Sequence, residues 1–99
     1  MMRLGRYGKL KPGAVDEYLR LHREMSPELR AIHTHAGLRN FTIYRRGLDL
    51  FSYLECDDWD RALAYLSTDP LAQTWSQHMA ALLDDPLPWE TLEEAWRLE

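Results

Sequence analysis

The hydrophobic pattern at the start of the chain changes from strand-like to helix-like at one turn. Residues 2–10 alternate apolar and polar side chains, diluted by two glycines, and precede the turn signal Lys11-Pro12-Gly13. Beyond the turn, apolar and aromatic residues recur at three- and four-residue steps, so they share one face of a predicted helix. These residues are Ala14, Tyr18, Leu21, His22 and Met25. Ser26 and Pro27 are a typical N-cap and first helical position, and they predict a second helix that stops at Gly37.

Two strands joined by a short turn are predicted in the middle of the chain. Residues 38–45 and 50–55 are the strands, and residues 45–49 form the turn between them. In the first strand the predicted alternation places Phe41 and Ile43 on one face, and Leu38, Asn40, Thr42 and Tyr44 on the other face. In the second strand it places Phe51, Tyr53 and Glu55 on one face, and Leu50, Ser52 and Leu54 on the other face. Because both faces carry large apolar groups, we expect both to be buried, one of them against a second copy of the chain.

The last third of the chain predicts two helices followed by a strand. Asp57-Asp58 is expected to cap a helix from Trp59 to about Leu66, and Asp69 with Pro70 opens another, which finishes near Asp84-Asp85-Pro86. An apolar stripe runs along this last helix at Leu71, Trp75, Met79 and Leu82. Residues 94–98 are predicted as the final strand, with Trp96 and Leu98 on one face. The order predicts an α+β fold of the ferredoxin-like βαββαβ type, as a single domain over residues 1–99.

Composition limits the classes of function. The chain has 99 residues, of which 45% are hydrophobic and 28% charged, and its net charge of −4 argues against a nucleic-acid partner. Arg45-Arg46 is the only adjacent basic pair, and we interpret it as a solvated strand end. No apolar run is long enough for a membrane span, and the first residues are too polar for a signal peptide. We therefore expect a cytoplasmic protein without a membrane partner.

The single cysteine and the histidines do not predict a metal or redox site. Cys56 stands alone, which excludes an internal disulfide, and its place at a strand end favours a semi-buried structural residue over a nucleophile. His33 and His35 are two residues apart and point to nearly opposite sides of a helix. No set of Cys, His, Asp or Glu has the spacing of metal ligands, and there is no glycine-rich phosphate loop.

Tyr18 and His22 are the residues best suited to chemistry. Histidine has the side-chain pKa nearest to neutrality, so it gives and takes a proton at low cost. Tyr18 lies four residues earlier, where its phenol neighbours the imidazole and can orient a hydroxyl group. The spacing alone fits the buried face of an amphipathic helix better than a site. Trp75 suits the apolar face of a sugar, although a tryptophan in such a stripe more often belongs to the core.

Short motifs spread in order over nearly the whole chain carry a resemblance to one family. The motifs are Glu17-Tyr18-Leu19-Arg20-Leu21-His22, Pro27-Glu28-Leu29 with Gly37, Asn40-Phe41-Thr42-Ile43-Tyr44, Leu50-Phe51 with Leu54-Glu55, Trp59, Thr68-Asp69 with Gln73, Trp75 and Met79, and Leu92-Glu93-Glu94-Ala95-Trp96-Arg97-Leu98. In this order and at these intervals they resemble the L-rhamnose mutarotase family. The resemblance implies a homodimeric α+β barrel that needs no cofactor. It also implies an isomerase that interconverts the anomers of L-rhamnose or a related deoxyhexose such as L-fucose.

The resemblance further implies roles for individual residues. His22 corresponds to the family's proton donor, Tyr18 to its first substrate-binding tyrosine, and Phe41 to its second. The family's paired tryptophans fall at Trp75 and Ser76. His22 is then expected to protonate the ring oxygen, Tyr18 to hold the anomeric end, and Trp75 to stack under the sugar. Phe41 would form a wall of the pocket.

Three residues depart from the family pattern. Phe41 lacks the hydroxyl of the corresponding tyrosine, Ser76 replaces an indole, and Ser26 stands where the family usually carries an aromatic residue. The acid–base half of the site is therefore kept, whereas the half that reads the sugar is altered. His35 and His78 are further polar candidates for sugar contacts.

Two other classes of function stay open at this point. A dimeric α+β barrel monooxygenase-type enzyme, cofactor-free or haem-dependent, has the same architecture. A non-catalytic small-molecule binding module would use the Tyr18–His22 pair only structurally. Fold alone does not separate these classes, whereas a haem absorption band or accelerated anomer exchange would.

Overall fold

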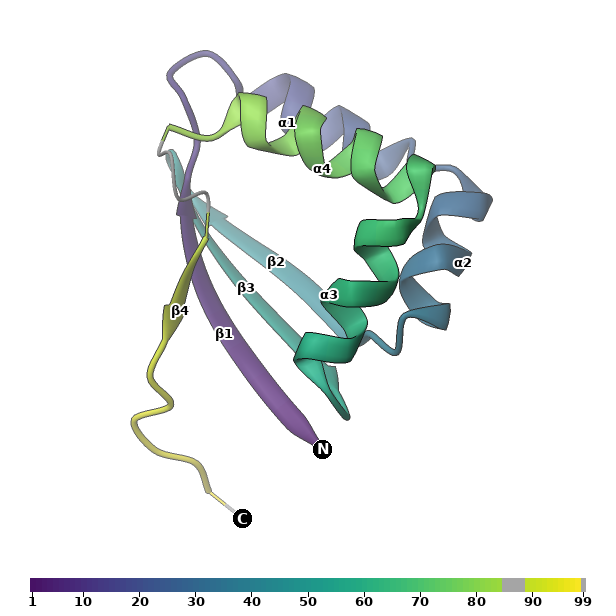
Figure 1. Ribbon diagram of the computed structural model, residues 1–99. Helices are drawn as coiled ribbons and strands as arrows, with labels where there is room; N and C mark the ends of the chain where they lie inside the picture. Colours follow the sequence, from purple (N-terminus) through teal and green to yellow (C-terminus); the bar gives the residue numbers. More distant parts are fainter. Residues whose placement is uncertain (85–88, 99) are drawn as a thin grey trace.

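The computed structural model describes residues 1–84 and 89–98 and has the predicted order of elements (Figure 1). The elements are β1 (Met2–Lys9), α1 (Val15–Arg23), α2 (Pro27–His35), β2 (Arg39–Arg46), β3 (Asp49–Cys56), α3 (Trp59–Thr68), α4 (Pro70–Leu82) and β4 (Glu90–Leu92). The strands form one antiparallel sheet in the order β2-β3-β1-β4, and the helices cover one of its faces. The predicted ferredoxin-like α+β fold is confirmed.

Side-chain caps fix the predicted helix starts. The Ser26 hydroxyl accepts a hydrogen bond from the Leu29 amide at 3.1 Å, at the start of α2. The Asp58 carboxylate accepts one from the Arg61 amide at 3.1 Å, at the start of α3. Asp69 accepts two such bonds, at 2.9 and 3.0 Å, and begins α4 directly after α3. Each cap satisfies an amide that the helix itself leaves unpaired, and is worth about 1 kcal/mol.

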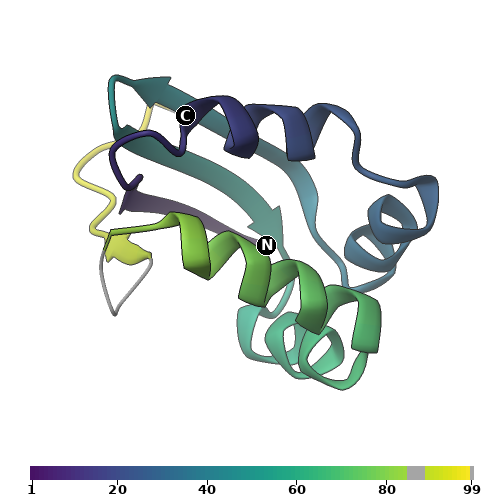
Figure 2. The same ribbon diagram turned by 90° about the horizontal axis from the view of Figure 1, so that it is seen from above.

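The core lies between the sheet and the helices. Along β3 the alternation is as predicted: Leu50, Ser52 and Leu54 are buried under the helices, whereas Phe51 on the other face is 44% exposed. Most of the buried apolar residues of the described chain form two clusters, one of Leu10, Ala14, Tyr18, Leu50, Met79 and Leu83, and another of Leu4, Leu38, Leu54, Cys56 and Ala62. Figure 2, seen from above, shows α1 and α4 running across the same face of the sheet.

One prediction for β2 is wrong because the strand contains a bulge. Arg39 is opposite Glu55 and Thr42 is opposite Tyr53, so two β2 residues face one β3 residue between these pairs. Asn40 within the bulge has a φ of 52°, a left-handed conformation that asparagine tolerates better than most residues. Strict alternation predicts that Leu38 and Phe41 lie on opposite faces of the sheet. The extra residue in the bulge instead places Leu38 on the helix-covered face, where it is buried.

The last strand lies earlier than predicted. Residues 94–98 are not a strand; instead β4 pairs with Gly5–Tyr7 of β1. Continuing this register would bring Glu94 opposite Arg3, and these two side chains do form an ion pair at 2.8 Å. The same register carries residues 96–98 beyond β1, which begins at Met2, so no strand remains to pair with them. Trp96 and Leu98 are accordingly 77% and 79% exposed, despite their alternating pattern.

Cys56 is more deeply buried than expected, with 1% of its surface exposed, and burial raises the pKa of its thiol. The last helix ends at Leu82, and the proline-rich loop after it, residues 85–88, lies outside the described residues. Among the described residues, no helix is long and apolar enough to cross a membrane.

Candidate active site

A cavity of about 530 Å³ opens between α1, α2, the β2 strand and α4. Tyr18, His22, Phe41 and Trp75 all line it, so residues from three separate segments of the chain meet at one place. Ser76 is exposed on α4 and is not among the lining residues. Four of the five residues singled out in the sequence are therefore brought together, and the fifth is not.

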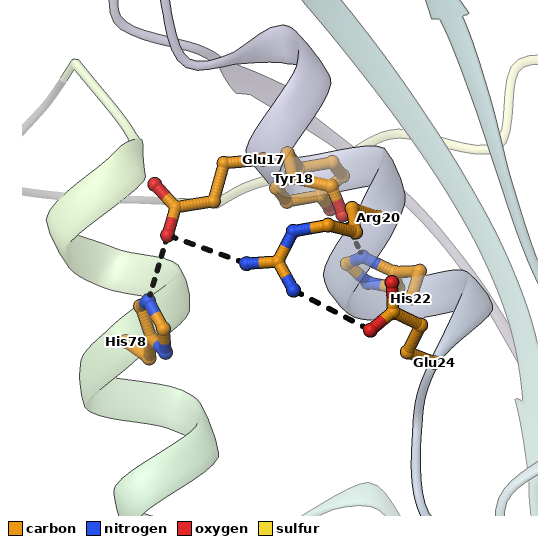
Figure 3. Close-up of polar contacts among 6 residues, drawn as sticks. All are labelled: Glu17, Tyr18, Arg20, His22, Glu24 and His78. Carbon is orange, nitrogen blue, oxygen red and sulfur yellow. Dashed lines mark hydrogen bonds and ion pairs between the residues drawn. The ribbon is translucent and has the colours of Figure 1, made fainter.

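The His22 imidazole is held in a defined orientation. Its ring lies 4.4 Å from the Tyr18 ring and 5.0 Å from the Trp75 ring, which it meets edge-on, as centroid distances. The Nδ1 atom lies 2.8 Å from the Tyr18 backbone carbonyl (Figure 3). A carbonyl oxygen can only accept, so Nδ1 carries the hydrogen and donates it. In the neutral ring Nε2 is then unprotonated and free to take a proton.

The electrostatic surroundings keep His22 neutral. Burial lowers the pKa of the imidazole below its ordinary value of 6.5, and the nearby His33 lowers it further. The hydrogen bond to the Tyr18 carbonyl acts in the opposite direction but is the smaller effect. Near pH 7 the side chain is thus a base with an available lone pair.

Tyr18 is suited to donate a hydrogen bond rather than to act as a base. Only 2% of its surface is exposed, and burial raises the pKa of its phenol to about 12, against a lowering effect from Arg6. The hydroxyl therefore keeps its proton at neutral pH. A permanently protonated phenol beside a neutral imidazole offers one donor and one acceptor to a bound hydroxyl compound.

Sequence reasoning missed the basic residues around the cavity. Arg30, His33 and Arg45 line it, whereas none of the described lining residues is an aspartate or glutamate. Arg30 and His33 are three residues apart on α2, a spacing that already indicates a shared face. Arg45 is exposed, as expected of a strand end, yet it also borders the cavity. The cavity is consequently richer in hydrogen-bond donors than the sequence motifs indicated.

The two other histidines proposed as sugar contacts lie elsewhere. His35 borders a separate small cavity beside Cys56. His78 lies on the surface of α4, with its Nε2 atom 3.6 Å from the Glu17 carboxylate of α1 (Figure 3). Glu17 also faces Arg20 at 3.9 Å, and such exposed pairs contribute little to stability. Within residues 1–84 and 89–98 no three His, Cys, Asp or Glu side chains are grouped to hold a metal ion.

Comparison with known proteins identifies the family. The sequence profile of the L-rhamnose mutarotases matches residues 3–98. The chain belongs to the L-rhamnose mutarotase family. An L-rhamnose mutarotase of Ligilactobacillus salivarius is 34% identical over 88 residues, covering 84% of this chain and 81% of that protein. One of Lactiplantibacillus plantarum is 31% identical over 105 residues, covering both chains completely.

The fold of this L-rhamnose mutarotase family member also matches a solved structure. The crystal structure of an L-rhamnose mutarotase from Formosa agariphila superimposes with a TM-score of 0.80 over the whole of both chains, at 23% identity. Family membership makes the protein an isomerase that acts on carbohydrates. Of the site residues predicted from the sequence, Tyr18, His22, Phe41 and Trp75 line this cavity, whereas Ser76 does not.

Proposed function

We propose that this protein interconverts the α and β anomers of L-rhamnose, or of a related deoxyhexose such as L-fucose, with His22 as the acid–base group. The observation that carries the proposal is the fixed tautomer of His22 at the cavity wall: Nδ1 is bound to a carbonyl, and Nε2 is a free base. A neutral imidazole near pH 7 has the proton affinity that reversible proton transfer to and from a sugar requires.

The reaction moves one proton between two oxygen atoms of the same carbon. Nε2 of His22 accepts the proton of the anomeric hydroxyl, the bond between the anomeric carbon and the ring oxygen breaks, and a carbonyl forms. The imidazolium then protonates the ring oxygen, which gives the open-chain aldehyde. Rotation about the C1–C2 bond presents the other carbonyl face, and the reverse steps close the ring as the opposite anomer. His22 is neutral at the start and at the end.

The other lining residues position the sugar. The Tyr18 hydroxyl, which keeps its proton, would donate to the oxygen at the anomeric end. Trp75 offers a flat apolar surface to the C–H face of the ring, and it also meets the imidazole edge-on. Phe41 gives a wall without a hydroxyl. Ser76 follows Trp75 on α4 but is exposed and does not line the cavity, so no direct sugar contact is proposed for it.

We further propose that the active form is a cytoplasmic homodimer built through the outer face of the sheet. Tyr44, Phe51 and Leu92 on that face are 66%, 44% and 40% exposed, which is unusual for a surface that faces only water. A second copy would cover them. Light scattering on the purified protein measures the mass, and a monomer at micromolar concentration would contradict this part of the proposal.

Anomer exchange measured by saturation-transfer NMR tests the proposed function. L-Rhamnose, L-fucose and D-ribose are each incubated with the protein, and the exchange rate between their anomeric protons is compared with the rate in buffer. We expect acceleration of L-rhamnose or L-fucose, increasing in proportion to protein concentration. If no member of the panel is accelerated, the proposed function is wrong.

A further inference from the structure

The cavity is basic although the chain as a whole is acidic. The protein has 16 aspartate and glutamate residues against 12 lysine and arginine residues, for a net charge of −4. Yet Arg30, His33 and Arg45 line the cavity, and none of its described lining residues is acidic. A random distribution of charges would place acidic groups among them, because acids outnumber bases. The sign of the charge at this one place therefore favours an anionic group on the ligand.

The guanidinium of Arg30 is not neutralised by a carboxylate of the described chain. Arg30 lies on α2, exposed to solvent at the cavity wall, and none of the ion pairs among the described residues involves it. By contrast, Arg3, Arg20 and Arg39 each form an ion pair with a carboxylate. The planar fork of N–H donors on Arg30 is therefore available to a carboxylate or phosphate, which guanidinium groups bind through two parallel hydrogen bonds.

His33 lies one helical turn after Arg30 and is held in the same way as His22. Its Nδ1 atom is 2.8 Å from the backbone carbonyl oxygen of Leu29, so Nδ1 donates a hydrogen bond there and Nε2 is left for the cavity. In the protonated ring Nε2 also donates, and an anion can then accept from it. Helix α2 thus presents two groups that can donate to an anion, three residues apart on the face that lines the cavity.

The Arg30–His33 pair is close to the proposed base. His33 acts electrostatically on His22, and α2 leads through a short loop into β2, whose Phe41 lines the same cavity (Figure 1). In a pyranose, C6 is attached to the ring carbon that also carries the ring oxygen. A sugar whose ring oxygen lies at His22 can therefore reach towards α2 with a group at C6.

We propose that the cavity also takes hexoses that carry an anionic group at C6, a carboxylate or a phosphate, and binds them more tightly than neutral deoxyhexoses because Arg30 binds the anionic group with His33 beside it. The inference rests on the proposed function, because it places the ring oxygen of the sugar at His22. A deoxyhexose has only a methyl group at C6, which leaves Arg30 without a partner. Arg45, whose Nη1 donates to the Gly47 carbonyl at 2.8 Å, adds positive potential from the β2 side.

Sugars that differ only at C6 test the preference. L-Fucose, L-galactose, L-galacturonate and L-galactose 6-phosphate share one ring configuration and carry a methyl, hydroxymethyl, carboxylate and phosphate-bearing group at this position. L-Rhamnose, L-mannose and L-mannuronate form the second series. We expect the KM for anomer exchange of an anionic member to be about tenfold below that of its neutral counterpart, the effect of a charge-assisted hydrogen bond at a partly exposed site. Raising the NaCl concentration from about 0.05 to about 0.5 M should reduce this difference, because salt screens the attraction.

Variants of α2 show whether the preference depends on the proposed residues. Arg30→Gln removes the charge but keeps a good helix former, so α2 should stay folded. In this variant the ratio of neutral to anionic KM should fall to about one, whereas Arg30→Lys, which keeps the charge without the fork, should retain part of the preference. His33→Gln should reduce the ratio a few-fold. Arg61→Gln, exposed on α3 and away from the cavity lining, is the matched control for the loss of one positive charge and should keep the full ratio.

Binding measured without turnover separates this inference from the proposed function. Titration calorimetry with L-galacturonate and L-fucose gives dissociation constants independently of anomer exchange. If L-rhamnose or L-fucose is accelerated but no anionic sugar has a lower KM, or if the preference survives in Arg30→Gln, the inference is wrong and the proposed function stands. If no sugar is accelerated but L-galacturonate binds more tightly than L-fucose in a manner that requires Arg30, the anion site stands and the proposed function is wrong. A preference for the carboxylate alone, or for the phosphate alone, supports the inference and identifies the anionic group.

Discussion

Replacing His22 by alanine removes the proposed base and leaves the helix around it able to form. Alanine has the highest helix propensity, so α1 gains about 0.5 kcal/mol locally. The loss is two ring contacts, to Tyr18 at 4.4 Å and to Trp75 at 5.0 Å, and one hydrogen bond to a backbone carbonyl. At about 0.5–1.5 kcal/mol for each ring pair and about 1 kcal/mol for the bond, less the gain in helix propensity, the net cost in stability is about 1.5–3.5 kcal/mol. A typical domain, stable by 5–15 kcal/mol, stays folded after such a change.

The effect on the rate is much larger than the effect on folding. A positioned acid–base group typically contributes about 10²–10⁴-fold, which corresponds to about 3–5 kcal/mol of activation free energy. Enzyme-dependent exchange of the anomers should therefore fall to near the rate in buffer. Because uncatalysed mutarotation proceeds in water, the assay must subtract that background at each sugar concentration.

Saturation-transfer NMR measures the rate, and far-UV circular dichroism with urea unfolding checks the fold. His22→Asn is the second variant, because its amide can still donate to a carbonyl but cannot take up a proton near pH 7. Both variants should lose exchange to a similar extent. A folded His22→Ala protein that exchanges anomers within threefold of the natural rate would refute the role of His22, whatever sugar is used.

Four further outcomes are expected from the structure. Because the pKa of His22 lies below 6.5, exchange should be constant above that pH and fall in acid as the base becomes protonated; a rate that rises in acid would contradict this. Because the pKa of His22 is lower in the folded protein, the unfolded chain binds the proton at a higher pH. The His22 contribution to stability is therefore present above about pH 6.5 and decreases as the pH falls. Urea titrations across pH 5–8 would measure this decrease. Tyr18→Phe keeps the ring but loses the donor, and should lower kcat/KM about 10- to 100-fold with little change in melting temperature. Leu54→Ala, at a fully buried position that does not line the cavity, should cost about 2–5 kcal/mol in urea unfolding without altering KM.

Local signals sufficed for most of the secondary structure. Ser26, Asp58 and Asp69 could be recognised as caps because a cap depends on a residue's own side chain and the next few amides. The alternation of β3 was equally readable, because one of its faces is buried under the helices. Tyr18 and His22 share a helical turn, so their contact also follows from spacing.

Features that depend on distant partners could not be read in the same way. Trp96 and Leu98 alternate like a strand, but whether they pair depends on where β1 begins, ninety or so residues away in the sequence. Leu38 changes side because of a bulge whose position is set by the β2–β3 register. Arg6 gave no signal at all: only the fold brings its guanidinium between Phe41, Trp59 and Trp89. A single arginine in a short, glycine-containing strand looks like an ordinary surface residue.

The bulge at Asn40 has a consequence for how such a site can change over evolutionary time. The extra residue lies next to Phe41, and the Asn40 amide donates to Glu55 at 3.0 Å on the neighbouring strand. Deleting one residue here would move the β2 side chains before the bulge to the opposite face of the sheet. Leu38 would then leave the core, while Ile43 would stay in place. Chain length at this point is therefore constrained by folding even though the adjoining wall is free to vary in chemistry. Lineages of this enzyme should differ at position 41 by substitution and seldom by insertion or deletion around Asn40, so that new sugar preferences arise without a new backbone.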